Sequence, residues 1–403
     1  MNRRLFCQSV VAAGVAATAT NGPGLRAGIP AAPRPARPAR GTTHLFSPLQ
    51  LRGVTLRNRI AMSPMCQYSS DDGFATDWHL SHHAARAVGG AGLLIAEATG
   101  VEPEGRITPH CLGLWKDEHV PALRRVTDFV RAHGTVAGIQ LAHAGVKGSR
   151  QRPLHPTPNA FVPLDEGGWQ PVGPTDKRYR TDGEAPRGLT VAEIQGLTRS
   201  FAAAAERAVA AGFEVVELHF AHGYLGHSFL SPLMNERTDA YGGAFENRTR
   251  FLLETVRAVR AVLPEETPLF VRLSCTDWVE GGWTLDDSVA VSRLLADEGV
   301  DLIDCSTGGA TRNAEIPVGP GYQVPFAERI RRDAGIPTGA VGLITEPEQA
   351  DAIVAEGRAD LILMGRELLR DPYWPHRAWV ALGPETAPPI AREYAWALAE
   401  TRR

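Results

Sequence analysis

Cysteine is scarce in this 403-residue chain, and it also lacks a strong charge imbalance. The formal charge is -3, from 42 Lys+Arg against 45 Asp+Glu, so no overall field attracts nucleic acid or an anionic membrane surface, and neither partner is expected. The five cysteines are odd in number, widely spaced and without a C-x-x-C pair, which suggests neither a disulfide framework nor a zinc or iron–sulfur cluster. Any functional cysteine is therefore expected to act alone. The cysteines are Cys7, Cys66, Cys111, Cys275 and Cys305.

The first 43 residues differ in kind from the rest. Arg3 and Arg4 precede a short apolar run, Val10 to Ala19, that cannot span a bilayer. This order predicts a signal peptide at residues 1–29, and the paired arginines favour twin-arginine export to the periplasm. The alternative is a mis-called start codon and a cytoplasmic protein. Residues 30–43, rich in Pro, Arg and Ala, are expected to be a linker before a single domain at 44–403.

The domain has an ordinary globular composition, with 43% hydrophobic and 22% charged residues. From Arg59 onward, short apolar runs alternate with longer stretches of helical period, which is typical of βα units around a parallel sheet. Eight such units in roughly 330 residues favour a single (β/α)8 TIM barrel over an open doubly wound sheet. The expected strands are Arg59–Met62, Leu93–Glu97, Thr135–Gln140, Val215–His219, Leu269–Leu273, Leu302–Cys305, Pro337–Ala340 and Leu361–Met364.

Other segments add detail to this barrel. Residues Leu49–Leu56 alternate about a turn and predict a hairpin that plugs the bottom of the barrel. The Gly89–Gly92 cluster ends a helix and enters a strand, the reverse of a pyrophosphate-binding turn, so we interpret it as a helix stop. The long Pro- and Gly-rich insertion His143–Leu189 after the third strand is expected to lie over the top face as a substrate-shaping lid. Helices are expected at Val191–Ala211 and Phe245–Leu263.

Chemistry in this fold is done at the carboxyl ends of the strands, so polar residues at these ends are the candidates. The loops after the last two strands build phosphate sites in many barrels, and Gly342, Gly365 and Arg366 stand there. Taken alone, Gly342 or Gly365 is more simply interpreted as a turn residue. Their joint occurrence at the ends of the last two strands favours an anion site. The other strand-end residues are Ser63 to Tyr68, Ala98, Gln140, His219, His222, Tyr224, Arg272 and Ser306 to Gly308.

The pair His219-x-x-His222 allows two interpretations. With Glu217 on the same strand face it could hold a metal, although a zincin spacing is absent. Alternatively, two imidazole donors converge on one substrate oxygen and Tyr224 supplies a proton. Both remain open on the residues alone.

Several residues have simpler interpretations. His79, His82 and His83 lie in a helix where no carboxylate or cysteine completes a site, so we expect surface or packed helix positions. Trp283 and Trp374 are expected to pack in the core or in loops.

Long and specific motifs identify a family. The segments are Asn58–Tyr68 (NRIAMSPMCQY), Glu97-Ala98, Ile139–Gly145 (IQLAHAG), Glu217–Leu225 (ELHFAHGYL), Phe229–Pro232 (FLSP) and Asn235–Gly243 (NERTDAYGG). From about Leu45 to the C-terminus the chain resembles the Old Yellow Enzyme ene-reductases, particularly the bacterial subclass with a cysteine near the flavin. The resemblance implies FMN as cofactor, NADPH or NADH as reductant, and reduction of the C=C bond of small α,β-unsaturated carbonyl compounds.

The resemblance also assigns roles. It implies that the flavin N5 delivers hydride to the β-carbon, that His219 and His222 hold the carbonyl oxygen, and that Tyr224 protonates the α-carbon. Substrate contacts are expected from Tyr68 as well. FMN contacts are expected from Ser63, Pro64, Met65, Cys66, Ala98, Gln140, Arg272, Gly342, Gly365 and Arg366. A homodimer or homotetramer is expected.

Two departures from the family pattern matter. Relatives in this subclass often have Arg where Val146 stands, which places a contact after Ala144-Gly145 in doubt. The C-terminal end lacks the Arg that some relatives project into a neighbouring subunit and resembles relatives that use a tryptophan. Trp396 is thus expected either to contact substrate, across a dimer interface, or simply to pack the last helix.

Two other functions remain as alternatives. A metal-dependent TIM-barrel hydrolase would yield colourless, metal-containing protein, and a flavin redox-sensing module with Cys66 as the reporter would be yellow with negligible enone turnover.

Overall fold

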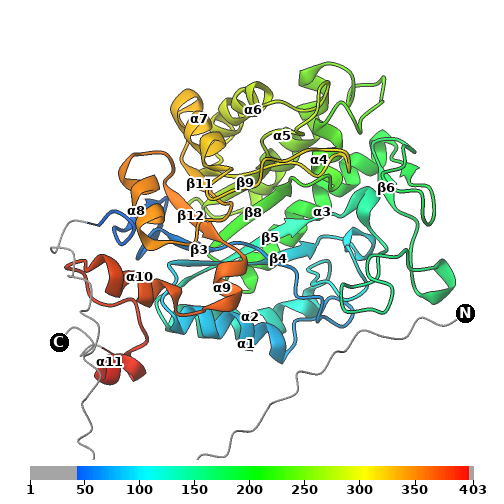
Figure 1. Ribbon diagram of the computed structural model, residues 1–403. Helices are drawn as coiled ribbons and strands as arrows, with labels where there is room; N and C mark the ends of the chain where they lie inside the picture. Colours follow the sequence, from blue (N-terminus) through cyan, green and yellow to red (C-terminus); the bar gives the residue numbers. More distant parts are fainter. Residues whose placement is uncertain (1–42, 399–403) are drawn as a thin grey trace, which may run out of the picture. The chain divides into compact units, whose positions relative to one another are not determined.

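The computed structural model describes residues 43–398. The expected signal peptide (1–29) and all but the last residue of the expected linker (30–43) lie outside them. Eight parallel strands close into a barrel in the order β10-β11-β12-β3-β4-β5-β8-β9 (Figure 1). The (β/α)8 prediction is therefore confirmed, and the open doubly wound alternative is wrong. No helix within these residues is long and apolar enough to cross a bilayer.

All eight strands lie where the apolar runs predicted them. Each is buried along its whole length, as expected for a parallel sheet that has helices outside and packed side chains inside. The pairing of Met62 with Met364 joins the first strand to the last. The strands are β3 (Ile60–Met62), β4 (Leu93–Gly100), β5 (Val136–Ala142), β8 (Val215–Phe220), β9 (Leu269–Ser274), β10 (Leu302–Ser306), β11 (Thr338–Ala340) and β12 (Leu361–Met364).

Helices alternate with the strands on the outside of the barrel (Figure 1). The first helix ends at Gly89, so the helix-stop interpretation of this glycine cluster is confirmed. At Gly90 the backbone has φ +103° and passes close to the carbonyl of Pro389, which leaves no room for a side chain. The helices are α1 (Asp77–Val88), α2 (Val120–Ala132), α3 (Val191–Ala210), α4 (Leu225–Leu230), α5 (Phe245–Val262), α6 (Leu285–Asp297), α7 (Val324–Ala334), α8 (Pro347–Ala355), α9 (Arg366–Arg370), α10 (Trp374–Leu382) and α11 (Arg392–Leu398).

The N-terminal hairpin closes one end of the barrel. Strands β1 (Leu49–Leu51) and β2 (Val54–Leu56) pair antiparallel, and their leucines share a buried cluster with inward-facing barrel residues such as Leu93 and Phe270. The predicted plug is thus confirmed. Because it occupies the amino ends of the strands, the polar strand-end residues belong to the opposite, open end.

The insertion after β5 runs over that open end. It contains only two very short strands, β6 (Val172–Gly173) and β7 (Arg187–Gly188), which pair with each other. Its residues Lys177 to Tyr179 line a cavity, as the expected lid should. In the core, Trp283 and Trp374 are fully buried, which confirms their expected packing role.

Candidate active site

Predicted residues from four strand ends meet in one cavity. Arg272, Gly342, Gly365 and Arg366 line a space of about 230 Å³ together with Ser306 and other residues. Gly342 has φ +118°, and a Cβ there would lie 3.0 Å from the Tyr322 ring. A side chain would therefore narrow the cavity.

The two histidines that the sequence singled out lie side by side. His219 is the second-last residue of β8, and its Nε2 is 3.4 Å from Nδ1 of His222. The other ring nitrogen of His222 lies 2.7 Å from the Ser306 hydroxyl, and its backbone N–H donates to Ser274 Oγ at 2.8 Å. His222 has φ +61°, a conformation that non-glycine residues rarely adopt, so the surrounding contacts hold it there.

Burial keeps both imidazoles neutral. It lowers the pKa of His219 and of His222 well below the usual value, and the positive charge of Arg272 lowers both further. A neutral imidazole has one N–H to donate, and it adds no charge to the site. The pair can therefore act as hydrogen-bond donors toward a substrate oxygen across the neutral pH range.

Two tyrosines complete this part of the site. The ring of Tyr224 lies 5.1 Å from that of His219, and burial raises the pKa of Tyr224 above its ordinary value. Burial raises the pKa of Tyr68 as well, and this residue has a left-handed backbone with φ +52°. Both phenols stay protonated at neutral pH, so either has a proton to give.

Comparison with known proteins identifies the family. Residues 44–382 match the model of the NADH:flavin oxidoreductase / NADH oxidase family. The chain belongs to this family. It is 48% identical over 356 residues to the NADPH dehydrogenase of Geobacillus thermodenitrificans, covering 88% of this chain and 99% of the relative. It is 49% identical over 354 residues to that of Listeria innocua, covering 87% and 99%.

Solved structures of related enzymes share the fold. Morphinone reductase aligns with a TM-score of 0.70 at 27% identity, over 84% of this chain and 90% of that one. The Old Yellow Enzyme homologue from Zymomonas mobilis aligns with a TM-score of 0.68 at 29% identity, over 83% and 91%. The resemblance to Old Yellow Enzymes is thus confirmed, and this member of the family is an FMN-dependent oxidoreductase that uses NAD(P)H.

The cavity residues fit the FMN of this family. Gly342 and Gly365 have no side chains, so their backbone faces the cavity directly. The exposed Arg366 guanidinium lines the same cavity. Arg272, which lines the same cavity, is buried on β9, and Gln140 is buried on β5. Backbone amides, an arginine fork and an amide are donors suited to a phosphate and a flavin ring edge.

Three ionisable groups below the site are buried together. Gln140 donates from Nε2 to Glu217 Oε1 at 2.8 Å, and Arg272 Nε lies 3.0 Å from Asp304 Oδ2. Burial raises the pKa of Glu217 and of Asp304, and Arg272 opposes this shift for both. Glu217 thus faces Gln140 instead of completing a metal site with His219. Residues 43–398 contain no cluster of three or more His, Cys, Asp or Glu that could hold a metal.

A buried pair that the sequence analysis missed supports the loop after β8. His227 Nε2 lies 3.1 Å from Asp277 Oδ1, and both side chains are fully buried. The backbone N–H of Gly223 donates to His227 Nδ1 at 2.8 Å, while Asp277 accepts from Ser231 and from the backbone of Trp283. This pair fixes the turn between the catalytic histidine and tyrosine candidates. Because His227 and Asp277 are far apart in sequence, no local motif predicts their pairing.

Lys147 is a second residue that was missed. Its Nζ donates to the carbonyls of His222 at 2.6 Å and of Gly309 at 2.8 Å, and it lies 4.1 Å from the centre of the Tyr179 ring and 5.6 Å from that of Tyr224. Burial lowers the pKa of Lys147 to about 7. The available signal was its position two residues after the Ile139–Gly145 motif.

Lys147 predicts a pH dependence. If Tyr224 is the proton donor to an enone, the cation 5.6 Å from the centre of its ring favours proton release. Oxidation of the reduced enzyme by the enone should then slow as pH rises through about 7 and the ammonium is lost. In Lys147→Met this break should vanish, and Lys177→Met, which removes a surface cation paired with Glu236, should keep it. Stopped-flow rates between pH 6 and 9 measure both. A break that persists in Lys147→Met would assign the titration to another group.

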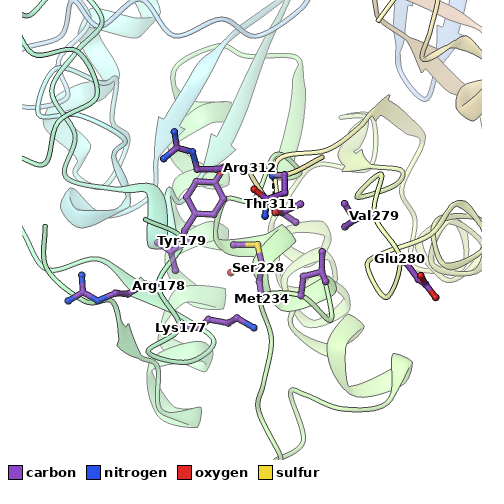
Figure 2. A pocket seen from close by; sticks show the side chains of 13 residues that line it. Lys177, Arg178, Tyr179, Ser228, Met234, Val279, Glu280, Thr311 and Arg312 are labelled. Atoms are coloured by element: carbon purple, nitrogen blue, oxygen red, sulfur yellow. Dashed lines mark hydrogen bonds between the residues drawn. The ribbon is translucent and has the colours of Figure 1, made fainter. Parts of the chain in front are cut away.

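The lid and the loop after β10 enclose a larger cavity beside Lys147. It measures about 510 Å³, and Figure 2 shows Tyr179, Arg312 and Met234 around it. Val146 lines its wall and packs with Met234 and Ala310. At position 146 the wall of this cavity is therefore apolar.

The structure corrects one expectation about the histidines of α1. His79 is a packed helix residue as expected, but its Nε2 lies 3.2 Å from Glu97 Oε1, so the expectation that no carboxylate joins it is wrong. The expectation that any functional cysteine acts alone stays a prediction. The pair of His79 and Glu97 forms between segments that are distant in sequence.

Trp396 does not behave as a packing residue. Its side chain is 81% exposed on α11, so the expectation that it packs the last helix is wrong. Its expected contact with substrate across a subunit interface stays a prediction.

Proposed function

We propose that the enzyme reduces C=C bonds conjugated to a carbonyl group, with FMN as the immediate reductant and NAD(P)H as the source of electrons. The observation that carries the proposal is the His219–His222 pair. Two neutral imidazole nitrogens lie 3.4 Å apart beside the protonated phenol of Tyr224. Such a pair suits a single oxygen atom that gains negative charge during reaction.

The protein residues have distinct tasks in this proposal. His219 and His222 donate hydrogen bonds to the carbonyl oxygen, which withdraws electrons from the conjugated bond and stabilises the enolate oxygen. When bound, FMN supplies the hydride that adds to the β-carbon. Tyr224 then gives its proton to the α-carbon. Ser306 orients the His222 ring through the 2.7 Å contact, which fixes the direction of its other nitrogen.

Other residues would hold FMN. Gly342, Gly365 and Arg366 suit the phosphate, Gln140 suits the pyrimidine edge, and Arg272 offsets negative charge near N1 and C2=O. The loop after β3 and the end of β4 would border the ring, with contacts from Ser63, Pro64, Met65, Cys66 and Ala98.

The proposal is tested on purified protein. We expect bound flavin, reduction by NADPH or NADH without oxygen, and rapid reoxidation by cyclohexenone in a stopped-flow instrument. Protein that contains no flavin and acquires none from added FMN would contradict it. Yellow protein with negligible enone turnover would favour the redox-sensing module, and metal-dependent activity of colourless protein would favour the hydrolase.

Arg366 provides a test of the phosphate site. Arg366→Gln should raise the Kd of FMN by about 10- to 100-fold, the value of a lost charge-assisted hydrogen bond. Fluorescence titration of flavin-free protein measures this. Arg370→Gln is the matched control, because Arg370 lines the same cavity but pairs with Glu367 at 3.1 Å. Equal losses in both variants would mean that Arg366 contributes only general charge.

We also propose that residues 1–29 direct twin-arginine export. The paired Arg3 and Arg4 ahead of a short apolar run support this. Mass spectrometry of the mature N-terminus tests it, and a cytoplasmic protein that retains Met1 would contradict it.

A further inference from the structure

The barrel interior below the histidine pair is polar, although bulky branched residues usually fill the inside of this fold. Gln140 and Glu217 are paired in register on β5 and β8, and Arg272 and Asp304 are paired on β9 and β10. The exposed fractions of these four side chains are 7% or less. Burial of two carboxyl groups costs free energy, so this polar layer is expected to have a function. The function proposed above uses Gln140 and Arg272 but neither carboxyl group.

Glu217 is held by a single hydrogen bond. It precedes His219 by two residues on β8, so both side chains lie on the same face of the strand and Glu217 is one level deeper in the barrel. Its Oε1 accepts from Gln140 Nε2 at 2.8 Å, and its Oε2 accepts no hydrogen bond from residues 43–398. A fully buried ionised carboxylate needs several donors, so one N–H favours the protonated acid.

The charges around Glu217 favour the same state. Arg272 Nε lies 3.0 Å from Asp304 Oδ2, so the cation of this layer already has an anion beside it. An ionised Glu217 would add a second, uncompensated negative charge inside the barrel. Burial and the charge of Asp304 raise the pKa of Glu217 to about 8, although Arg272 and the Gln140 N–H oppose this shift. Glu217 is therefore the carboxyl group of this layer that holds a proton at neutral pH.

The hydrogen bond to Glu217 also restricts the Gln140 amide. A carboxamide has one carbonyl oxygen and two N–H bonds. Because one N–H is committed to Glu217, the oxygen and the second N–H remain for a ligand. The pyrimidine edge of a flavin offers the complementary pair, a carbonyl oxygen next to an N–H. An amide that is already oriented loses less conformational entropy on binding than a freely rotating one.

We propose that Glu217 is a positioning residue of the flavin site, which stays a neutral acid and holds the Gln140 amide in the orientation that binds the pyrimidine edge. The inference rests on the contact between Gln140 and FMN proposed above. A neutral Glu217 does not oppose the negative charge that a flavin gains on reduction, so the ion pair of Arg272 and Asp304 alone sets the charge of the polar layer.

Two variants separate orientation from packing. Glu217→Gln keeps an acceptor oxygen and the neutral state, so the Kd of FMN should stay within about twofold of the parent value. Glu217→Leu fills a similar volume without an acceptor, and its Kd should rise about 10-fold, the value of one orienting hydrogen bond. In a Gln140→Leu background, Glu217→Leu should cause no further loss. Fluorescence titration of flavin-free protein measures the Kd, and circular dichroism confirms that each variant is folded.

Infrared spectroscopy of the holoenzyme tests the proton directly. A protonated carboxyl group has a C=O stretching band that is separate from the bands of carboxylates and amides. We expect this band in the parent at pH 7, its loss in Glu217→Gln and its retention in Asp304→Asn. A parent without the band, or a band that disappears in Asp304→Asn instead, would overturn the proposal.

The reduction potential of the bound flavin is a third readout, measured by equilibration with a reference dye. Glu217→Gln should leave it nearly unchanged, because no charge is removed. Asp304→Asn is the matched contrast, because it removes the ionised partner of Arg272 and should favour reduced flavin by about 10-fold, or about 30 mV for two electrons.

Three results would contradict the role of Glu217. A rise in potential in Glu217→Gln as large as that in Asp304→Asn would mean that Glu217 is ionised. An unchanged Kd in Glu217→Leu would mean that it does not orient Gln140, and an equal loss in the Gln140→Leu background would assign its effect to packing. None of these measurements uses an enone, so failure of enone reduction would overturn only the proposed function.

Discussion

Replacement of His219 or His222 by Ala should lower turnover of cyclohexenone by about 10² to 10³, the usual cost of one missing oxyanion donor. Each ring supplies one neutral N–H from a fixed position, His219 from a buried one and His222 from a partly buried one, and water that enters the vacated space is a poorer donor because it is not held in place. The loss should fall on the oxidative half-reaction. Reduction of the flavin by NADPH should change less, since no carbonyl oxygen is reduced in that step.

Controls distinguish a lost donor from a damaged fold. His44→Ala removes an exposed imidazole elsewhere and should leave the rate unchanged. His222→Asn retains an N–H donor and should fall between the parent and His222→Ala. Near-native turnover in His219→Ala and His222→Ala, with flavin still bound, would rule out their proposed role.

Tyr224→Phe should slow product formation by about 10² to 10⁴, because it removes the group that gives the α-carbon its proton. The ring still fills the same space beside His219, so packing should be conserved. The smaller loss is expected if water or Tyr68 delivers the proton instead. Protonation is measured by rapid-quench detection of the saturated ketone and by the solvent deuterium isotope effect on its formation.

Two matched variants complete that test. Tyr373→Phe removes an exposed phenol and should have no effect. The double variant Tyr68→Phe with Tyr224→Phe should be slower than Tyr224→Phe if Tyr68 serves as the substitute donor. If Tyr224→Phe reduces enones at the native rate, the acid belongs elsewhere.

Local patterns predicted the barrel well because each strand is a short apolar run and each connection contains a helical period. The strand-end rule then brought His219, Arg272 and Gly342 to the same end of the barrel. What the patterns did not predict are contacts between loops. Lys147 donates hydrogen bonds to the carbonyls of His222 and Gly309, and these residues come close to it only when the chain folds.

The buried histidines illustrate the same limit. Spacing along the chain excludes clusters formed by neighbours in sequence, but it carries no information on partners from other segments. His79 on α1 pairs with Glu97 on β4. His227 on α4 pairs with Asp277, which follows β9. Each pairing depends on the order of strands around the barrel.

The ammonium group of Lys147 ties the loop after β8 to the loop after β10, and at Gly309 the main chain is packed against the backbone of His222 with φ +99°. Efforts to broaden the range of accepted compounds by varying residues 308–313 would thus also disturb the alignment of the imidazoles. A substitution in this loop is therefore expected to change both the choice of substrate and the rate of reaction. Libraries that instead vary Val146 or Met234 offer a route to reshape the cavity while leaving that link in place.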